Sequence, residues 1–255
     1  MSSRKIDINA DAGESFGRWT LGNDVELFKF VTTVNIACGY HAGDPGTMRQ
    51  ALIEARGAGV SPGAHPGYPD LLGFGRRAMP VSIPDTIDYV IYQVGALQAI
   101  AATEGMVLTH VKPHGSLYAA VSKSPELAVR ISQALQSLQP GLPMLLAPGA
   151  ASDSVRSHNL NLVEENAADL GFDEEGRNLI EARPMPKDPE LVADQAVRMA
   201  FGTVMTVSGR ELPMSVQSIC IHGDRANAPQ IARVVRQRLE AAGVVVESAF
   251  RGDRR

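Results

Sequence analysis

Polar residues that can transfer protons or stabilise charge recur in this chain at the ends of short apolar segments. Asn9 and Asp11 alternate with isoleucine and alanine in KIDINADA, near the N-terminus. His110 and Lys112 alternate with other residues in VLTHVKPHG, where His114 follows. Carboxylate, imidazole and ammonium groups that converge in one cleft are typical of active sites. The spacing therefore predicts a site built from the ends of several strands.

Two loops after the second and third apolar segments add further candidates. They read CGYHAGDPGTM and GAHPGYPDLLGFGRR, and they contain His41, Asp44, His65, Asp70, Arg76 and Arg77. Asp44 either caps the helix that follows or belongs to a helix start that binds an anion. Arg76 and Arg77 form either a clamp for phosphate or carboxylate or a solvated pair on a loop. The residues alone leave both alternatives open.

Asp11, His41 and His65 are also candidate metal ligands, since two histidines and one carboxylate are a common set for catalytic zinc. The three residues are far apart in the sequence, so they form no local motif such as HExxH. A divalent metal is therefore an alternative interpretation of these side chains. Cys38 and Cys220 are expected to be free, buried thiols rather than nucleophiles.

Seven short strands, each followed by a helical pattern, are predicted to position these residues. The strands are Lys5–Asn9, Thr33–Ala37, Val60–Ala64, Val107–Lys112, Met144–Ala147, Asn161–Val163 and Ser218–His222. The helices are Asp24–Val31, Gly46–Arg56, Pro84–Thr103, Pro125–Ser137, Ala150–Arg156, Pro189–Ala200 and Ala228–Ala242. This alternation predicts one parallel (β/α) barrel domain over residues 1–255, with catalytic groups at the C-terminal strand ends. An open doubly wound sheet is the alternative.

The composition excludes several classes of function. The 255 residues are 44% hydrophobic and 20% charged, with a formal net charge of -4. A mildly acidic chain without a Lys/Arg-rich run has no electrostatic footprint for nucleic acid. The longest uncharged apolar segment, Tyr89–Thr103, is too short to span a membrane, and the N-terminus has no signal-peptide pattern. A cytoplasmic protein is therefore expected. The sequence contains neither a GxGxxG dinucleotide-binding turn nor a Walker phosphate loop.

Two segments lie outside the strand and helix pattern. Gly171–Lys187 is polar and irregular, which predicts a long loop. Thr203–Ser215 is predicted to form a hairpin around Ser208 and Gly209.

Five blocks of the sequence resemble the signature of the LamB/YcsF family. They are IDINADAGESFG, VNIACGYHAGDPGTM, GAHPGYPDLLGFGRR, HVKPHGSLY and ICIHGD, in this order between Ile6 and Asp224. The resemblance implies a seven-stranded, TIM-like (β/α) barrel of the glycoside hydrolase/deacetylase type. It also implies ATP-dependent hydrolysis of 5-oxoproline (pyroglutamate) to L-glutamate together with separate B and C subunits. ATP would be a cosubstrate of the complex, and the missing Walker loop favours a chain that receives a phosphorylated intermediate from its partners.

The family blocks also suggest roles for individual residues. Asp11, assisted by His41 or His65, would activate or position water, and Lys112 would stabilise the developing negative charge. The other matching positions are expected to bind substrate, and they are Asn9, Glu14, Asn35, Asp44, Asp70, Arg76, Arg77, His114, Glu165, Asp169, His222 and Asp224. Asp7, deeper in the first strand, is expected to be a structural partner.

One block departs from the family pattern. Where the family reads Glu-x-Phe-Ala-Asp-Arg-x-Tyr, this chain has Ala167, Leu170 and Phe172 in place of the first aromatic residue, the arginine and the tyrosine. Leucine cannot offer a substrate carboxylate the charge of arginine, so the exact lactam stays open. Two other functions remain as alternatives, namely a stand-alone metal-dependent amidohydrolase or deacetylase and a non-catalytic subunit that binds substrate.

Overall fold

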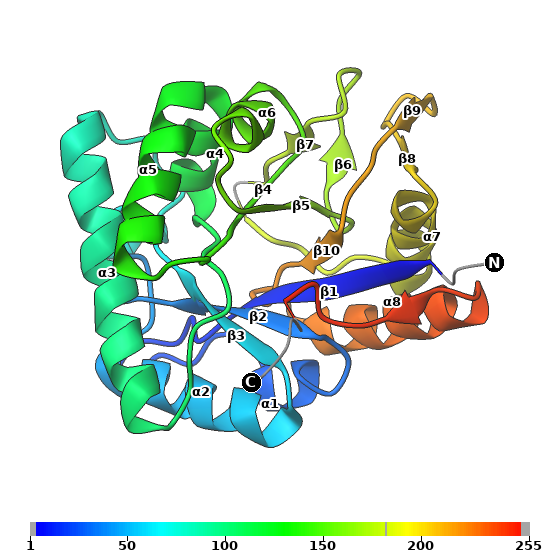
Figure 1. The fold of residues 1–255 in the computed structure, drawn as a ribbon. Coiled ribbons are helices and arrows are strands. Elements are labelled where there is room, and N and C mark those ends of the chain that lie inside the picture. The colour runs from blue at the N-terminus through cyan, green and yellow to red at the C-terminus, as the bar shows by residue number, and fades with distance from the viewer. Residues whose placement is uncertain (1–3, 182, 251–255) are drawn as a thin grey trace.

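A curled sheet of parallel strands lies at the centre of the molecule, and helices cover its outer face (Figure 1). The computed structural model describes residues 4–181 and 183–250. The main strands are β1 (Lys5–Ala12), β2 (Thr33–Ala37), β3 (Ser61–His65), β4 (Met144–Leu146), β5 (Leu162–Ala167) and β10 (Ser218–Ile221). They pair in the order β3-β2-β1-β10-β5-β4, and β11 (Val245–Val246) pairs with the start of β1. The α/β prediction with a parallel, barrel-like sheet is confirmed at this level.

Strand β1 shows why the sequence alternates. Ile6, Ile8 and Ala10 are at most 3% exposed and belong to the apolar core that the sheet shares with the helices. Asp7 and Asn9 point to the opposite, inner side of the sheet, where their side chains make hydrogen bonds to β2 and β10. Successive side chains of a strand point to opposite faces, so this pattern places polar groups inside the curl.

The predicted strand Val107–Lys112 is wrong as a regular strand. Within the described residues only Val111 of this segment forms β-bridges, one to β3 and one to β4. Pro62 and Pro143 lie opposite the segment and accept backbone hydrogen bonds, but proline has no N–H to return. The segment still spans the gap between β3 and β4, and the predicted count of seven regular barrel strands is not confirmed.

Four of the helices start at a capping side chain followed by a proline. The helices are α1 (Asp24–Leu27), α2 (Pro45–Ala58), η1 (Leu71–Gly73), α3 (Ile83–Thr103), α4 (Gly115–Lys123), α5 (Pro125–Leu138), α6 (Ala150–Ser157), α7 (Pro189–Ala200) and α8 (Ala228–Ala241). Asp44, Ser82, Ser124 and Asp188 accept backbone N–H groups as N-caps, each before a proline in the first turn. The pattern missed α4, and α1 ends earlier than predicted.

Two short hairpins lie beyond the main sheet. β8 (Thr203–Met205) and β9 (Glu211–Pro213) pair antiparallel, which confirms the predicted hairpin. β6 (Gly171–Phe172) and β7 (Asn178–Leu179) form a second hairpin inside the segment that was predicted to be a loop. Asp173 holds its turn by accepting from the backbone N–H groups of Glu175 and Arg177. In the part of the chain that the structure describes, no helix is long and apolar enough to cross a membrane.

Candidate functional site

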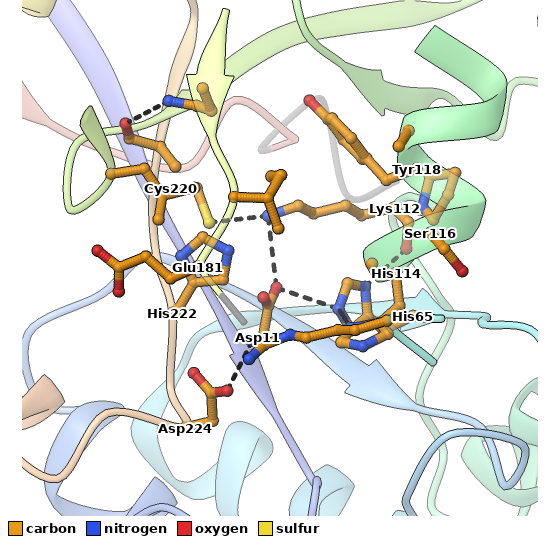
Figure 2. Close-up of a pocket in the computed structure, with 18 of the residues that line it drawn as sticks. Asp11, His65, Lys112, His114, Ser116, Tyr118, Glu181, Cys220, His222 and Asp224 are labelled. Carbon is orange, nitrogen blue, oxygen red and sulfur yellow. Dashed lines mark hydrogen bonds and ion pairs between the residues drawn. The ribbon is translucent and has the colours of Figure 1, made fainter. Parts of the chain in front are cut away.

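A cavity of about 410 Å³ opens where the carboxyl ends of the strands meet. Figure 2 shows Asp11, His65, Lys112 and His222 pointing toward it from four different parts of the sheet. The predicted site residues that line it are Asp11, His65, Arg76, Lys112, His114, Glu165, His222 and Asp224. The sequence pattern therefore brought eight of its candidates together around one cavity.

Asp11 and Lys112 form the charged centre of the site. The Lys112 Nζ lies 3.4 Å from the Asp11 Oδ1 and 3.5 Å from the Glu165 Oε2. Burial acts to raise the pKa of Asp11, but the neighbouring His65 and Lys112 outweigh it and hold this pKa well below its usual range. Burial also opposes the charge of Lys112, yet Asp11 and its other neighbours raise the pKa of that ammonium. The pair is therefore ionised at neutral pH.

Amide side chains beneath this pair fix its geometry. Asn35 donates through Nδ2 to the Oδ1 atoms of both Asn9 and Asp11, at 2.9 Å each. Lys112 donates to the same Asn9 oxygen at 3.1 Å. The His110 Nε2 contacts the Asn35 Oδ1 at 2.7 Å, and burial lowers the pKa of His110 to about 3, so this imidazole is neutral. These contacts fix the position of the Asp11 Oδ1.

Glu165 and Cys220 complete the surroundings of Lys112. The ammonium donates to the Cys220 Sγ at 2.8 Å, and burial raises the pKa of this thiol, which keeps it protonated. The Tyr118 hydroxyl donates to the other oxygen of Glu165, and burial raises the pKa of Tyr118. Cys220 thus lies in the site as a neutral neighbour of the lysine.

Three histidines and Glu14 pack beside Asp11. The His65 Nε2 lies 3.4 Å from the Asp11 Oδ1 and 3.0 Å from the His114 Nδ1. His41 stacks on His114 with 3.7 Å between ring centroids, and its Nε2 is 3.4 Å from the Glu14 Oε1. Burial lowers the pKa of His41 and of His114 and raises that of Glu14, so each of the three favours its neutral form.

A second ion cluster holds the far wall of the cavity. Asp169 accepts from His222 at 2.9 Å and from the Arg225 Nε at 2.6 Å. Arg225 also reaches Glu181 and the Met185 carbonyl in the segment after β7. Burial opposes the charge on His222, but Asp169 outweighs it and raises the pKa of His222. This cluster ties the β10 end to the loop that closes the site.

Other predicted binding residues lie away from the cavity lining. Asp44 accepts from the Gly46 and Gly17 backbone and caps α2, which matches the capping interpretation. Asp70 caps η1 and pairs with the exposed Arg77. Asn9, Glu14, Asn35, His41 and Asp169 are buried behind the lining residues. Their predicted contact with substrate is therefore indirect in this arrangement.

Sequence reasoning missed four titratable residues of the lining, namely Tyr118, Lys123, Glu181 and Arg225. Tyr118 and Lys123 belong to α4, which the pattern did not predict. Glu181 lies in the segment that was predicted to be an irregular loop. Such a segment has no periodicity from which to predict which side chains point into the cavity. Arg225 directly follows the ICIHGD block. Its charge and its position just after a predicted strand could have marked it as a candidate site residue.

Two metal-ligand groups occur among the described residues. Glu14, His41, His65 and His114 form one, and Asp11, Cys220 and His222 form the other. The predicted set of Asp11, His41 and His65 is thus divided between them, although Asp11 remains within 3.4 Å of His65.

Comparison with known proteins places the chain in a family. The model of the LamB/YcsF family matches residues 6–253. This chain belongs to that family. The A subunit of 5-oxoprolinase from Thermus thermophilus is 43% identical over 250 residues, which cover 96% of this chain and 99% of the relative. The corresponding A subunit from Azorhizobium caulinodans is 44% identical over 245 residues, or 94% and 97% of the two chains.

Solved structures agree with this placement. The crystal structure of the lactam utilization protein from Thermus thermophilus has a TM-score of 0.88 and 42% identity, and the match covers 95% of this chain and 99% of that one. A family 4 carbohydrate esterase from Streptomyces lividans has a TM-score of 0.51 at 14% identity, over 96% of this chain and 92% of that one. The second likeness is one of fold alone, and it agrees with the predicted deacetylase type of barrel.

The departure in the family block lies in the cavity wall. Ala167 and Leu170 both line the cavity and pack with Cys220 as a small apolar cluster. The neighbouring Arg225 does not replace the missing arginine, because its guanidinium is engaged by Asp169 and Glu181. This part of the wall is therefore uncharged toward a ligand.

Proposed function

We propose that this chain is the A subunit of a 5-oxoprolinase and that its cavity is where a lactam ring is hydrolysed. The curated relatives carry that name, and the similar crystal structure is of a lactam utilization protein. The observation that carries the proposal is the Asp11–Lys112 pair, an ionised carboxylate and ammonium 3.4 Å apart that line a cavity of about 410 Å³. This volume is in the range of small-molecule sites.

The chemistry requires activation, because a lactam carbonyl is a poor electrophile. ATP, as the cosubstrate of the complex, would transfer its γ-phosphoryl group to the lactam oxygen and leave as ADP. Water then adds to the ring carbon, the C–N bond breaks, and the ring nitrogen gains a proton. Hydrolysis of the resulting acyl phosphate by a second water releases L-glutamate and phosphate. The sum consumes one ATP and two waters per 5-oxoproline.

Asp11 is suited to orient the attacking water and to accept its proton. It is ionised at neutral pH, and Asn35 fixes one of its oxygens at 2.9 Å. Lys112 is suited to stabilise negative charge on the lactam oxygen or on the phosphoryl group. His65, 3.4 Å from Asp11, would help to position the carboxylate. A pre-set donor aimed at developing charge contributes about 100- to 1000-fold to the rate in enzymes of this kind.

Lys123 is the cavity cation best placed to recognise an anionic group of the substrate. Arg76 is paired with Asp224 at 2.7 Å, and Arg225 and Lys112 are paired as described above. Lys123 lines the cavity, is exposed, and has no ion pair within residues 4–181 and 183–250. We assign it the substrate carboxylate or a phosphate, with Arg76 as the second contributor.

B and C subunits complete the proposed enzyme. The relatives are named as one subunit, which implies others. We place ATP binding on the complex, and the site described here on this chain. A cytoplasmic location accords with ATP as cosubstrate and is part of the same proposal.

Glutamate release from 5-oxoproline and ATP tests the proposed function. The chain is assayed alone, with its B and C subunits, and with those subunits but without ATP. Turnover that requires all of them is expected. Turnover on other small lactams but not on 5-oxoproline would show that the Leu170 wall has changed the substrate. Turnover on no lactam, by a complex that assembles, would contradict the proposal.

A substitution in the wall separates these outcomes. Leu170→Arg restores the charge that the family pattern has at this position, and Leu170→Met is the matched control without charge. If the uncharged wall limits binding of the substrate carboxylate, Leu170→Arg lowers the KM for 5-oxoproline and Leu170→Met leaves it unchanged. Equal KM values for both variants would remove Leu170 from substrate recognition.

A further inference from the structure

Glu14, His41, His65 and His114 form a buried cluster whose donor atoms the proposed reaction leaves largely unused. One donor atom of each residue lies within 4.8 Å of every other. All four side chains are buried, and none of the residues is more than 6% exposed. Buried polar groups need partners, so the unused donor atoms of this cluster call for an explanation.

The hydrogen bonds of two rings fix where their lone pairs point. The His65 Nδ1 lies 2.7 Å from the Lys112 carbonyl oxygen, and the His114 Nε2 lies 2.8 Å from the Phe74 carbonyl oxygen. A carbonyl oxygen only accepts, so each of these nitrogens carries the proton. The remaining nitrogens, His65 Nε2 and His114 Nδ1, then face each other at 3.0 Å with lone pairs (Figure 2). This pair of nitrogens needs either a proton held between the two rings or a metal ion bound to both.

The other two members lack partners of their own. The Glu14 Oε1 and both ring nitrogens of His41 are buried and have no hydrogen-bond partner within the described residues. The Glu14 Oε1 lies 3.6 Å from the His114 Nδ1 and 3.4 Å from the His41 Nε2. Leaving such atoms unsatisfied costs roughly 1–3 kcal/mol each in general. One ion that all four residues share would satisfy the Glu14 Oε1 and one ring nitrogen of His41 together.

We propose that this cluster binds one divalent transition-metal ion of the zinc class, with Glu14, His41, His65 and His114 as its ligands. Three imidazoles and one carboxylate suit zinc better than magnesium or calcium, which prefer oxygen ligands. The carbonyl contacts of His65 and His114 are the outer-shell bonds that orient metal-binding histidines. His41 is held by ring packing rather than by hydrogen bonds, so its ring nitrogens are not engaged by another group among the described residues.

The second ligand group of the cavity is less suited to a metal ion. Its Cys220 sulfur already accepts from the Lys112 ammonium at 2.8 Å, and the same ammonium pairs with its Asp11. A divalent ion there would meet a fixed positive charge. At the four-residue cluster, Arg76 acts on Glu14, His41 and His114, but its charge is offset by Asp224 at 2.7 Å. A metal at this cluster would also place a Lewis acid beside Asp11.

Metal content of the chain alone tests the proposal, without partner subunits or substrate. The protein is purified without a polyhistidine tag, stripped with a chelator, incubated with Zn²⁺ or Co²⁺, and passed through a desalting column. Mass spectrometry of the eluate is expected to find one ion per chain, and bound zinc to raise the melting temperature. The Co²⁺ form is expected to show the visible bands of four-coordinate cobalt, without a sulfur charge-transfer band.

Substitutions locate the ion. His114→Ala and Glu14→Gln are each expected to weaken zinc binding by more than about 100-fold, which is the upper end for loss of an outer-shell partner. His158→Ala, which changes an exposed histidine after α6, is the matched control and is expected to keep full binding.

Circular dichroism checks the fold of each variant. If a variant unfolds, the cobalt spectrum of the wild-type protein tests the ligand set instead. No retained ion, unchanged binding in folded His114→Ala, or a sulfur band from Cys220 would overturn the proposal. None of these outcomes depends on lactam turnover, so a failure of the metal proposal can be distinguished from a failure of the proposed function.

Discussion

Asp7 and Asp11 are buried carboxylates on the same inner side of β1, yet their surroundings differ. Asp7 is 1% exposed and Asp11 is 4% exposed. Asp7 accepts from the hydroxyl groups of Thr32 and Thr33 at 2.6 Å each, and also from Ser218. Asp11 instead meets an ammonium, an amide and an imidazole, as described above. The N-terminal end of the strand is thus closed by neutral groups, and its C-terminal end is charged and opens to the cavity.

The comparison shows that neighbours, rather than burial, decide what a carboxylate does. Burial raises the pKa of Asp7, and its hydroxyl partners offset this only in part. Burial acts on Asp11 in the same direction, but Lys112 and His65 reverse the outcome. One strand therefore carries a carboxyl group that favours its neutral form at its start and an ionised one at its end.

Removing the Lys112 ammonium should have the largest effect on the difference between Asp7 and Asp11. Lys112→Met leaves Asp11 and Glu165 buried without their positive partner, which typically costs about 3–5 kcal/mol of unfolding free energy. Chemical denaturation at neutral pH measures this loss. Lys123→Met is the matched control, because that lysine is exposed and has no ion pair among the described residues, and its stability should stay near wild type. A stable Lys112→Met variant would mean that Asp11 is not held ionised by Lys112.

Removing the neutral carboxyl group should reduce stability at the other end of the strand. Asp7→Ala takes the acceptor from three buried hydroxyl groups and opens a small gap, with an expected loss of about 2–3 kcal/mol. Thermal melts measure this loss, and the folded variant is expected to keep its turnover. A loss of turnover in well-folded Asp7→Ala would contradict the division of roles along β1.

Asp24 extends the comparison to a carboxyl group outside the sheet. Burial raises its pKa to about 6, offset by the Gly13 N–H that donates to it at 2.8 Å. A raised folded-state pKa means that the ionised form destabilises the fold. This cost is absent below pH 3.8, grows through pH 6, and is complete above it.

Asp24→Asn removes that cost and keeps an acceptor for Gly13. The variant is expected to be more stable than wild type by about 1–2 kcal/mol at pH 8, since partial exposure screens part of the shift. The two proteins should converge near pH 4. Unfolding free energies over this pH range decide the case, and a constant difference between the two proteins would contradict the pKa of about 6.

Asp44 shows that hydrogen bonds alone can also favour an ionised carboxylate. The Thr47 hydroxyl, followed by the Gly17 N–H, lowers the pKa of Asp44 to about 2. A lowered folded-state pKa gives stability above pH 3.8 that is lost as the pH falls through 2. Asp44→Ala is expected to cost about 1 kcal/mol, as for other N-caps, and Asp44→Asn clearly less. Loss of substrate binding in Asp44→Asn with full stability would restore the anion-site alternative.

The sequence predicted the inner face of the sheet well, because alternation depends only on local pattern. Asn9, Asn35, His110 and Lys112 all point inward and join one hydrogen-bonded network, as their spacing required. The family blocks pointed to the same residues. Asp7 also proved to be the better satisfied of the two carboxylates.

The parts that the sequence did not predict depend on contacts between distant segments. Val107–Lys112 reads as a strand, but its ladder fails because of prolines on its neighbours, which the segment itself does not contain. The pairing of Arg225 with Asp169 spans 56 positions and brings the closing loop into the wall. The orientation of the His114 ring likewise depends on a hydrogen bond to the Phe74 backbone carbonyl. A pattern of side-chain types cannot predict a contact to a backbone group.

The rate of glutamate release by two isosteric variants tests the central claim most directly. Asp7→Asn and Asp11→Asn are each assembled with the B and C subunits and assayed with saturating 5-oxoproline and ATP, after circular dichroism has confirmed their fold. We predict that kcat falls by about 100- to 10,000-fold in Asp11→Asn, as for loss of a general base, and stays near wild type in Asp7→Asn. Equal kcat values for the two folded variants would contradict it.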